Sequence, residues 1–481
     1  MKFKPSKYQQ DIFDWTTKTE NTDQKLVVEA VAGSGKTTTG IEMLNYVPEE
    51  MSVVMLAFNR HIAQELSGKV PEHVWVKTYH ALGLQIISDN LGRPKVDGRK
   101  SYRLLERYLS KEYDKHLFYP ASRLLGLLKG NLLEPTDQNL WDLTVYHGID
   151  LNGDNSIVYR AVKGAFSDGL DETSIIDFDD MCHMPVYLNM SPRQYDFLFV
   201  DELQDTNMVQ SNLVEKSLKE TGRVVGVGDT FQSIYAFRGA DSEAIPNFIR
   251  KFGAETLPLS ITYRNPLKVV DFVNATFPEI QFEAWDNAKD GTIGSIKYDN
   301  ALVQFKPGDM ILCRTNAPLV SPAFSLIRRG VKAIIRGRDI GKNLKSLIKK
   351  MKATDLQNLL QKLRDYESRE ISKLLASDRE AQAQVLQDKV ETIYALSDNV
   401  NSIDDLNYRI DTVFSDENKG VVFSSIHKAK GLEAENVYIL KPELLPHPMA
   451  KKPWEVQQER NIMYVAYTRS LRNLLFVEGC P

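Results

Sequence analysis

Cysteine, long apolar runs and repeats are scarce or missing in this sequence, and each absence excludes a class of protein. Only 3 cysteines occur among 481 residues, Cys182, Cys313 and Cys480. They lie too far apart for a zinc site or a disulfide scaffold, so we expect a reducing, intracellular setting. No apolar run approaches the ~20 residues that a membrane helix needs, and residues 1–7 lack the apolar core of a signal peptide. Low-complexity tracts and short-period repeats are also missing, which favours ordinary folded domains.

An excess of charge of one sign is missing as well. The chain has 60 Lys and Arg against 64 Asp and Glu, a net charge of -4. Composition alone therefore does not indicate a nucleic-acid-binding protein, and any basic track must be local. One candidate is the segment 328–352, which has ten basic residues against a single acid, Asp339. A solvated helix face and a track that contacts phosphates explain this segment equally well.

Short apolar runs that alternate with helical patterns predict two α/β units with parallel sheets covered on both faces. The first set of runs is at 26–31, 52–57, 196–200 and 223–227, and the second is at 309–314, 332–336, 420–425, 436–440 and 474–477. Candidate helices at Tyr102–Tyr113 and Ala121–Leu128 indicate a helical insertion. We expect the first unit over 1–84 and 176–258 with an insertion over 85–175, and the second over 259–338 and 412–481 with a small helical insertion over 339–411.

A glycine-rich turn, Ala30–Thr37, joins the first apolar run to a helix. Gly33 and Gly35 allow a tight backbone whose N–H groups point at phosphate oxygens. The helix that follows offers its positive end to the same anion. Lys36 would reach the β- and γ-phosphates of a nucleotide, and Thr37 would bind Mg²⁺ through its hydroxyl. A plain glycine-rich turn is the alternative, which the preceding strand and the following helix disfavour.

Two carboxylates follow the apolar run at 197–200. Nucleotide hydrolysis needs one acid to hold the metal and another to position and deprotonate water, and these roles suit Asp201 and Glu202 respectively. An acidic loop after a core strand is the ordinary alternative. The phosphate loop upstream favours the hydrolytic interpretation.

From about residue 5 to residue 478, the sequence resembles the UvrD/Rep/PcrA-like superfamily 1A DNA helicases. The matching blocks, in order, are Pro5–Gln9, Ala30–Thr37, Ala57–Arg60, Thr78–His80, Phe178–Asp180, Asp201–Asn207, Gly228–Ala240, Tyr263–Arg264, Ser425–Glu433 and Gln458–Arg469. The resemblance implies two RecA-like P-loop NTPase domains, each with a mainly helical insertion, that bind ATP and Mg²⁺ in the cleft between them. The family's large second-lobe insertion, domain 2B, has only 339–411 to match it, so we expect a compact form with a reduced 2B insertion.

The resemblance also implies a role for each matching residue. The catalytic residues would be Lys36, Glu202, Gln232, Arg264 and Arg469. Nucleotide would be bound by Gln9, Ala32, Gly33, Ser34, Gly35, Lys36, Thr37, Thr38, Tyr263, Arg264, Glu433 and Arg469, with Tyr263 stacked on adenine, Gln9 at its edge and Glu433 near the ribose. The metal would be held by Thr37 and Asp201. DNA would be contacted by Asn59, Tyr79, His80, Tyr235, Phe237, Arg238 and His427, with Tyr235 and Phe237 the best candidates for stacking on bases.

The function implied is an ATP-dependent DNA helicase or translocase that moves 3′ to 5′ on single-stranded DNA and unwinds duplex. Two alternatives stay open: an ATP-switched single-stranded DNA-binding or protein-displacing translocase with little unwinding alone, and the motor subunit of a helicase–nuclease complex. The expected partners are single-stranded DNA, 3′-tailed duplex DNA and an accessory repair or replication protein, with no membrane. The expected location is the cytoplasm, with the nucleoid, or the nucleus in a eukaryote.

Overall fold

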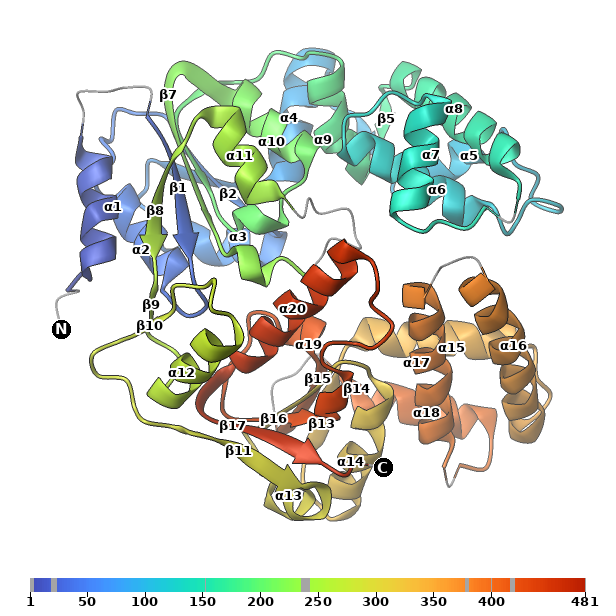
Figure 1. The fold of residues 1–481 in the computed structure, drawn as a ribbon. Coiled ribbons are helices and arrows are strands. Elements are labelled where there is room, and N and C mark those ends of the chain that lie inside the picture. The colour runs from blue at the N-terminus through green and yellow to red at the C-terminus, as the bar shows by residue number, and fades with distance from the viewer. Residues whose placement is uncertain are drawn as a thin grey trace. The chain divides into compact units, whose positions relative to one another are not determined.

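A computed structural model describes residues 4–18, 24–151, 153–234, 243–376, 380–398, 400–415 and 420–480 (Figure 1). By their contacts the residues divide into two compact units, one of residues 1–30 and 35–260 and the other of residues 31–34 and 261–481. No helix among the described residues is both long enough and apolar enough to cross a membrane.

The first unit is built on a six-stranded parallel sheet in the order β3-β2-β6-β7-β1-β8. Its strands are β1 (Lys25–Ala30), β2 (Val53–Ala57), β3 (Val74–Thr78), β6 (Tyr195–Val200), β7 (Leu218–Gly228) and β8 (Glu255–Leu259). All five residues of β2 are buried, because a strand in the middle of a parallel sheet is covered on both faces. Parallel strands end at the same edge of a sheet, so the segments that follow β1, β6 and β7 meet there.

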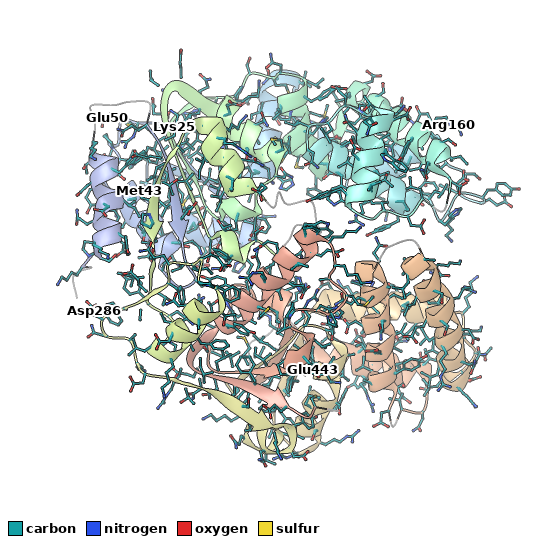
Figure 2. All side chains as sticks on the ribbon, in the orientation of Figure 1. Lys25, Met43, Glu50, Arg160, Asp286 and Glu443 are labelled. Atoms are coloured by element: carbon teal, nitrogen blue, oxygen red, sulfur yellow. The ribbon has the colours of Figure 1, made fainter. Side chains whose placement is uncertain are left out.

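Helices cover this sheet, and a second group of helices lies beside it (Figure 1). The helices of the sheet are α1 (Lys7–Thr17), α2 (Lys36–Leu44), α3 (Arg60–Ser67), α4 (Tyr79–Leu91), α9 (Phe178–Tyr187), α10 (Met208–Ser217) and α11 (Ala244–Phe252). The insertion has α5 (Lys100–Leu105), α6 (Phe118–Gly130), α7 (Asp137–Tyr146) and α8 (Asn155–Asp171), with the short strands β4 (Lys95–Val96) and β5 (Ile175–Ile176) at its two ends. Figure 2 shows Arg160 of α8 on its outer surface.

The prediction of a helix over Tyr102–Tyr113 is wrong in its extent, because α5 ends at Leu105 and turns follow. The hydroxyl oxygen of Ser110 accepts hydrogen bonds from the backbone N–H groups of Glu112 and Tyr113. The carboxylate of Asp114 accepts one from the N–H of Ser110 at 2.8 Å. These local bonds compete with those of a helix, as Ser and Asp side chains often do. The other expected helix, Ala121–Leu128, lies inside α6.

Buried ion pairs attach the insertion to α9. Asp180 lies 2.8 Å from the ammonium groups of both Lys100 and Lys129, and all three side chains are almost fully buried. Burial alone would raise the pKa of Asp180, but the two lysines outweigh it and lower that pKa. The sequence block Phe178–Asp180 is therefore held by charges from α5 and α6.

The second unit is built on a seven-stranded parallel sheet in the order β11-β17-β16-β12-β15-β13-β14. Its strands are β11 (Thr292–Lys297), β12 (Met310–Cys313), β13 (Ala333–Arg336), β14 (Phe414–Ser415), β15 (Val421–Ser425), β16 (Ala434–Leu440) and β17 (Ser470–Glu478), and β9 (Ile261–Thr262) pairs separately with β10 (Glu283–Ala284). The helices around it are α12 (Leu267–Thr276), α13 (Tyr298–Gln304), α14 (Ala317–Arg328), α19 (Ile426–Ala429) and α20 (Pro453–Tyr467).

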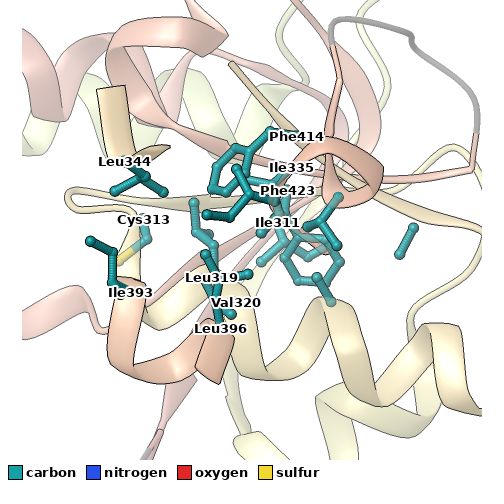
Figure 3. Packing of buried hydrophobic residues seen from close by; sticks show 14 of the residues in the cluster. Ile311, Cys313, Leu319, Val320, Ile335, Leu344, Ile393, Leu396, Phe414 and Phe423 are labelled. Atoms are coloured by element: carbon teal, nitrogen blue, oxygen red, sulfur yellow. The ribbon is translucent and has the colours of Figure 1, made fainter. Parts of the chain in front are cut away.

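Four helices form the insertion of the second unit: α15 (Arg338–Lys350), α16 (Leu356–Ala376), α17 (Glu380–Ser397) and α18 (Ile403–Val413). Their apolar side chains do not form a separate core. One continuous cluster contains Leu344, Ile393 and Leu396 from the insertion together with Ile311 and Phe423 from the sheet (Figure 3). The insertion is therefore packed onto the sheet as part of the same folded body.

A carboxylate strengthens this attachment. Asp388 of α17 accepts hydrogen bonds from the backbone N–H groups of Asn316 and Ala317 at 2.7 and 2.8 Å, and from the side-chain amide of Asn316 at 2.7 Å. These N–H groups begin α14 and have no partner within that helix. An acid at this end also meets the positive end of the helix dipole.

Candidate functional site

The backbone after β1 turns sharply at two glycines. Gly33 and Gly35 have φ of 72° and 79°, in the left-handed region that L-residues rarely adopt. Gly35 is the N-terminal cap of α2, and its carbonyl accepts the N–H of Thr39 at 2.8 Å. The side chains of Lys36 and Thr37 consequently start from the first turn of α2, the positive end of that helix.

Residues 31–34 make their contacts within the second unit. The N–H of Ala32 donates to the hydroxyl of Tyr464 at 2.8 Å, and the carbonyl of Gly33 accepts the N–H of Tyr263 at 2.9 Å. A Cβ at Gly33 would lie only 2.5 Å from the Cβ of Arg264. Gly33 is therefore required both for its backbone angle and for space. The buried hydroxyl of Ser34 has no hydrogen-bond partner among the described residues, which leaves a donor for an anion.

A pair of acids stands at the end of β6. Asp201 is 3% exposed, and burial together with repulsion from Glu202 raises its pKa to about 7, although Lys36 attracts its negative charge. Glu202 has φ of 52°, a strained angle for a residue with a side chain. A buried pair of acids close to a lysine suits a divalent cation bound together with a phosphate, because Mg²⁺ typically takes one or two carboxylates and completes its shell with phosphate and water.

Glutamines connect this acid pair to the end of β7. The side-chain amide of Gln204 donates to Glu202, and its carbonyl oxygen accepts the N–H of Asp229 at 2.9 Å. Asp229 in turn accepts from the side chain of Gln232 at 2.6 Å. Burial raises the pKa of Asp229, while Lys36 and Gln232 favour its charged form. Sequence reasoning gave Gln204 no role, although it lies two residues after Glu202 in the same block.

Gln9, expected at the adenine edge, is 2% exposed in α1. Its side-chain oxygen accepts the N–H of Ser6 at 2.9 Å, and its amide donates to the hydroxyl of Thr39 at 3.0 Å. The first bond is part of the capping box that starts α1. Gln9 thus links α1 to α2, while Thr38 next to Thr39 is exposed.

The second unit contains four residues that the resemblance assigns to the nucleotide. Arg264 forms a 2.7 Å ion pair with Glu433. Arg469 is 1% exposed, and it donates to the carbonyl of Val465 at 2.8 Å and to the hydroxyl of Thr468 at 3.0 Å. Tyr263 is 40% exposed, with its ring 5.9 Å from that of Trp285. An exposed pair of aromatic rings fits an adenine, and Trp285 is a residue that the motifs did not indicate.

The residues expected to contact DNA divide into three groups. Asn59, at the start of α3, is exposed, and His80 and His427 are half-buried. Tyr79 is 2% exposed within the core of the first unit, so its ring packs against protein and cannot stack on a base in this conformation. Tyr235, Phe237 and Arg238 lie outside the described residues.

Metal sites made of protein ligands alone are missing from the described part of the chain, where no group of three or more His, Cys, Asp or Glu could hold an ion.

Comparison with known proteins decides the family. The UvrD/REP helicase N-terminal domain matches residues 14–253, and the UvrD-like helicase C-terminal domain matches residues 420–477. The chain belongs to the UvrD/REP helicase family. The two parallel sheets are accordingly its two RecA-like domains, which confirms the predicted fold class. The stretch between the two matches contains all four helices of the second insertion.

Curated relatives in the UvrD/REP family are similar at modest identity. The ATP-dependent DNA helicase PcrA of Leuconostoc citreum is 28% identical over 294 residues, which cover 53% of this chain and 37% of that protein. DNA helicase II of Haemophilus influenzae is 28% identical over 282 residues, 52% of this chain and 37% of that protein. PcrA of Staphylococcus aureus is 26% identical over 289 residues. The chain thus matches less than two-fifths of the length of these relatives.

Proposed function

We propose that the protein is an ATP-dependent DNA helicase or translocase that moves 3′ to 5′ along single-stranded DNA. The observation that carries the coupling of hydrolysis to DNA is the hydrogen-bonded chain Glu202–Gln204–Asp229–Gln232. It joins the acids suited to hydrolysis to the start of the block Gly228–Ala240, the block that the family resemblance assigns to DNA. A chain of this kind gives hydrolysis and DNA binding a physical connection. The proposed direction of movement rests on the family resemblance alone.

In this mechanism the residues of the phosphate loop bind ATP and the acids activate water. Gly33, Ser34 and Gly35 would bind the phosphates through N–H groups and the free hydroxyl, and Lys36 would neutralise their charge. Bound Mg²⁺, held by Thr37 and Asp201, would polarise the phosphates. Glu202 would accept a proton from the attacking water. Arg264 and Arg469 would stabilise charge on the γ-phosphate, which requires both to leave the bonds that they make within the second unit.

The first test removes the phosphate-binding cation. Lys36→Ala should abolish ATP hydrolysis with and without single-stranded DNA, because no other described side chain of the loop carries positive charge. Lys69→Ala is the matched control: it removes an exposed lysine of the same unit that pairs only with the neighbouring Glu65, and it should keep wild-type activity. Hydrolysis that survives in Lys36→Ala would contradict the proposal.

A second test separates DNA coupling from hydrolysis. Phe237→Ala should reduce DNA stimulation and strand separation more than it reduces basal hydrolysis, because a base stacked on an aromatic ring contributes about 1–3 kcal/mol. Basal and DNA-stimulated ATPase rates, measured side by side, check this. Equal loss of both rates would count against coupling through this block.

The small insertion favours a second candidate, a translocase that displaces proteins or switches its grip on DNA but unwinds little by itself. Among the described residues, the insertion consists of the four helices α15–α18, where the resemblance implies a large domain. Fluorescent duplexes with 3′ and 5′ tails, tested in parallel, distinguish the two. ATP hydrolysis without strand separation would favour the translocase, alone or as the motor of a larger complex, and separation of the 5′-tailed duplex alone would overturn the proposed direction.

A further inference from the structure

One side of α15 carries a line of lysines. Lys342, Lys345 and Lys349 follow one another at three and four residues, the spacing of neighbours on one helix face. The opposite face is apolar, with Leu344, Leu347 and Ile348 buried in the core of the second unit. Lys342 and Lys349 are exposed. The helix is thus held in place by its apolar face and presents its charged face to solvent.

Two acids near this line are already paired with lysines. Lys345 forms an ion pair with Asp411 of α18, with their charged atoms 2.5 Å apart. Asp339, the one acid of α15, pairs at 2.7 Å with Lys428, which follows His427 in α19. No ion pair joins Lys342 or Lys349 to an acid within the described residues. Their charge is therefore available to a ligand.

An exposed tyrosine lies on α18, the helix that packs against α15. Contacts show that α15 and α18 run antiparallel, since a Cβ at Gly341 would lie 3.2 Å from Phe414, while Lys345 contacts Asp411. Tyr408 lies one turn before Asp411 on α18, which puts it level with the stretch of α15 between Lys345 and Lys349. It is 76% exposed. The ring of Tyr408 therefore lies in water on the helix that packs against α15, where it is accessible to a ligand.

We propose that Lys342, Lys349 and Tyr408 form a contact for single-stranded DNA outside the helicase motifs. The lysines would bind phosphates, and the ring would stack on an unpaired base. A track of positive charge with an adjoining aromatic is what strands without base pairing need, whereas a duplex buries its base faces and offers phosphates alone. The proposal rests on the proposed function, and it gives the small insertion a role as a second grip on the strand.

The test uses the full chain and labelled oligothymidine, with a blunt duplex of equal length as the second ligand. Tyr408→Ala should weaken oligothymidine binding by about fivefold or more, and Tyr408→Phe should restore it, because a ring without the hydroxyl still stacks. Lys342→Gln with Lys349→Gln should weaken binding and lower the slope of log affinity against log salt by about 1 to 1.5, since each contact with a single strand contributes about 0.7.

Matched variants control for position. Tyr113→Ala removes a tyrosine of similar exposure, 77%, from the first unit, and Lys289→Gln with Lys297→Gln removes two exposed lysines from the second unit. Neither should change binding. Wild-type affinity in Tyr408→Ala and in the lysine variant would overturn the inference, as would equal loss on the blunt duplex. A wild-type protein that fails to bind oligothymidine would instead overturn the proposed function.

Discussion

Asp201 is an acid that folding makes harder to ionise, and this matters because a carboxyl group binds a metal ion in its charged form. Its pKa of about 7, caused by burial and by Glu202, lies well above the value of about 3.9 for an aspartate in water. Between these two pH values the folded protein holds a proton that the unfolded chain has lost. Stability should therefore fall as pH rises through this window, and metal binding should strengthen.

Asp201→Asn tests both consequences. At pH 8 without ligands the variant should be more stable than wild type, by on the order of 1 kcal/mol, because it buries no charge. Chemical denaturation at pH 5 and pH 8 measures this. Wild-type affinity for Mg²⁺ with nucleotide should rise between pH 6 and pH 8, while the variant should bind weakly at both. An asparagine variant that is less stable at pH 8 would contradict the account.

The residues of the motifs could be predicted because each follows a recognisable local pattern in the sequence. The sequence indicated Lys36, Asp201 and Glu202 from the turn and strand that precede them. It could not show that Gln204 bridges Glu202 and Asp229, since that bridge depends on β6 and β7 being neighbours. It could not show that Tyr79 is buried either, because a tyrosine at the start of a helix can face the core or solvent.

At the scale of elements, sequence patterns indicated the inner strands and missed the edges. Strands β3 and β8 bound the first sheet, and β11 and β14 bound the second. Inner strands such as β2 are continuous apolar runs. Edge strands are half-exposed, and β8 and β11 contain Pro258 and Gly294, which propensities disfavour in strands. A continuous apolar run in the sequence results from burial on both faces of a strand, and edge strands are not buried in this way.

The ion cluster that joins α9 to its neighbours predicts a large effect from one side chain. Asp180→Asn should destabilise the first unit by about 3–5 kcal/mol, because it removes the counter-charge 2.8 Å from the buried Lys100 and leaves the buried Lys129 with Asp177 at 3.7 Å. Asp168→Asn removes a more exposed acid that pairs with Arg107, and it should cost below about 1 kcal/mol. Urea denaturation compares them, and similar losses in the two variants would contradict the buried-cluster account.

At the scale of the whole chain, the second insertion and its RecA-like domain share one core. The sequence predicted a helical insertion over 339–411 but not what those helices pack against. An amphipathic pattern shows which face of a helix is buried, and it does not show which element covers that face. In the same way, no single motif indicates how one unit of the chain relates to the other. A shared core implies that the insertion unfolds together with the sheet.

Ile393→Ala tests this cooperativity. The loss of a buried side chain from α17 should destabilise the second unit by about 2–4 kcal/mol. Hydrogen exchange should show amides of α17 and of strand β12 losing protection together. Val385→Ala, on an exposed face of the same helix, should change neither. Loss of protection in α17 alone would mean that the insertion folds separately.

Because α15–α18 are attached to the sheet, the position of α16 reports the orientation of the whole second unit. This helix has 21 residues, about 30 Å of helix, and it cannot pivot independently of a core to which Leu359 and Leu363 belong. A dye on the exposed Ser368 after replacement by cysteine would therefore report rotations of the entire body that carries it, amplified by the reach of the helix. Cys182 and Cys313 are buried, whereas Cys480 is half-buried, so replacing Cys480 by serine in the same variant would direct labelling to the introduced thiol.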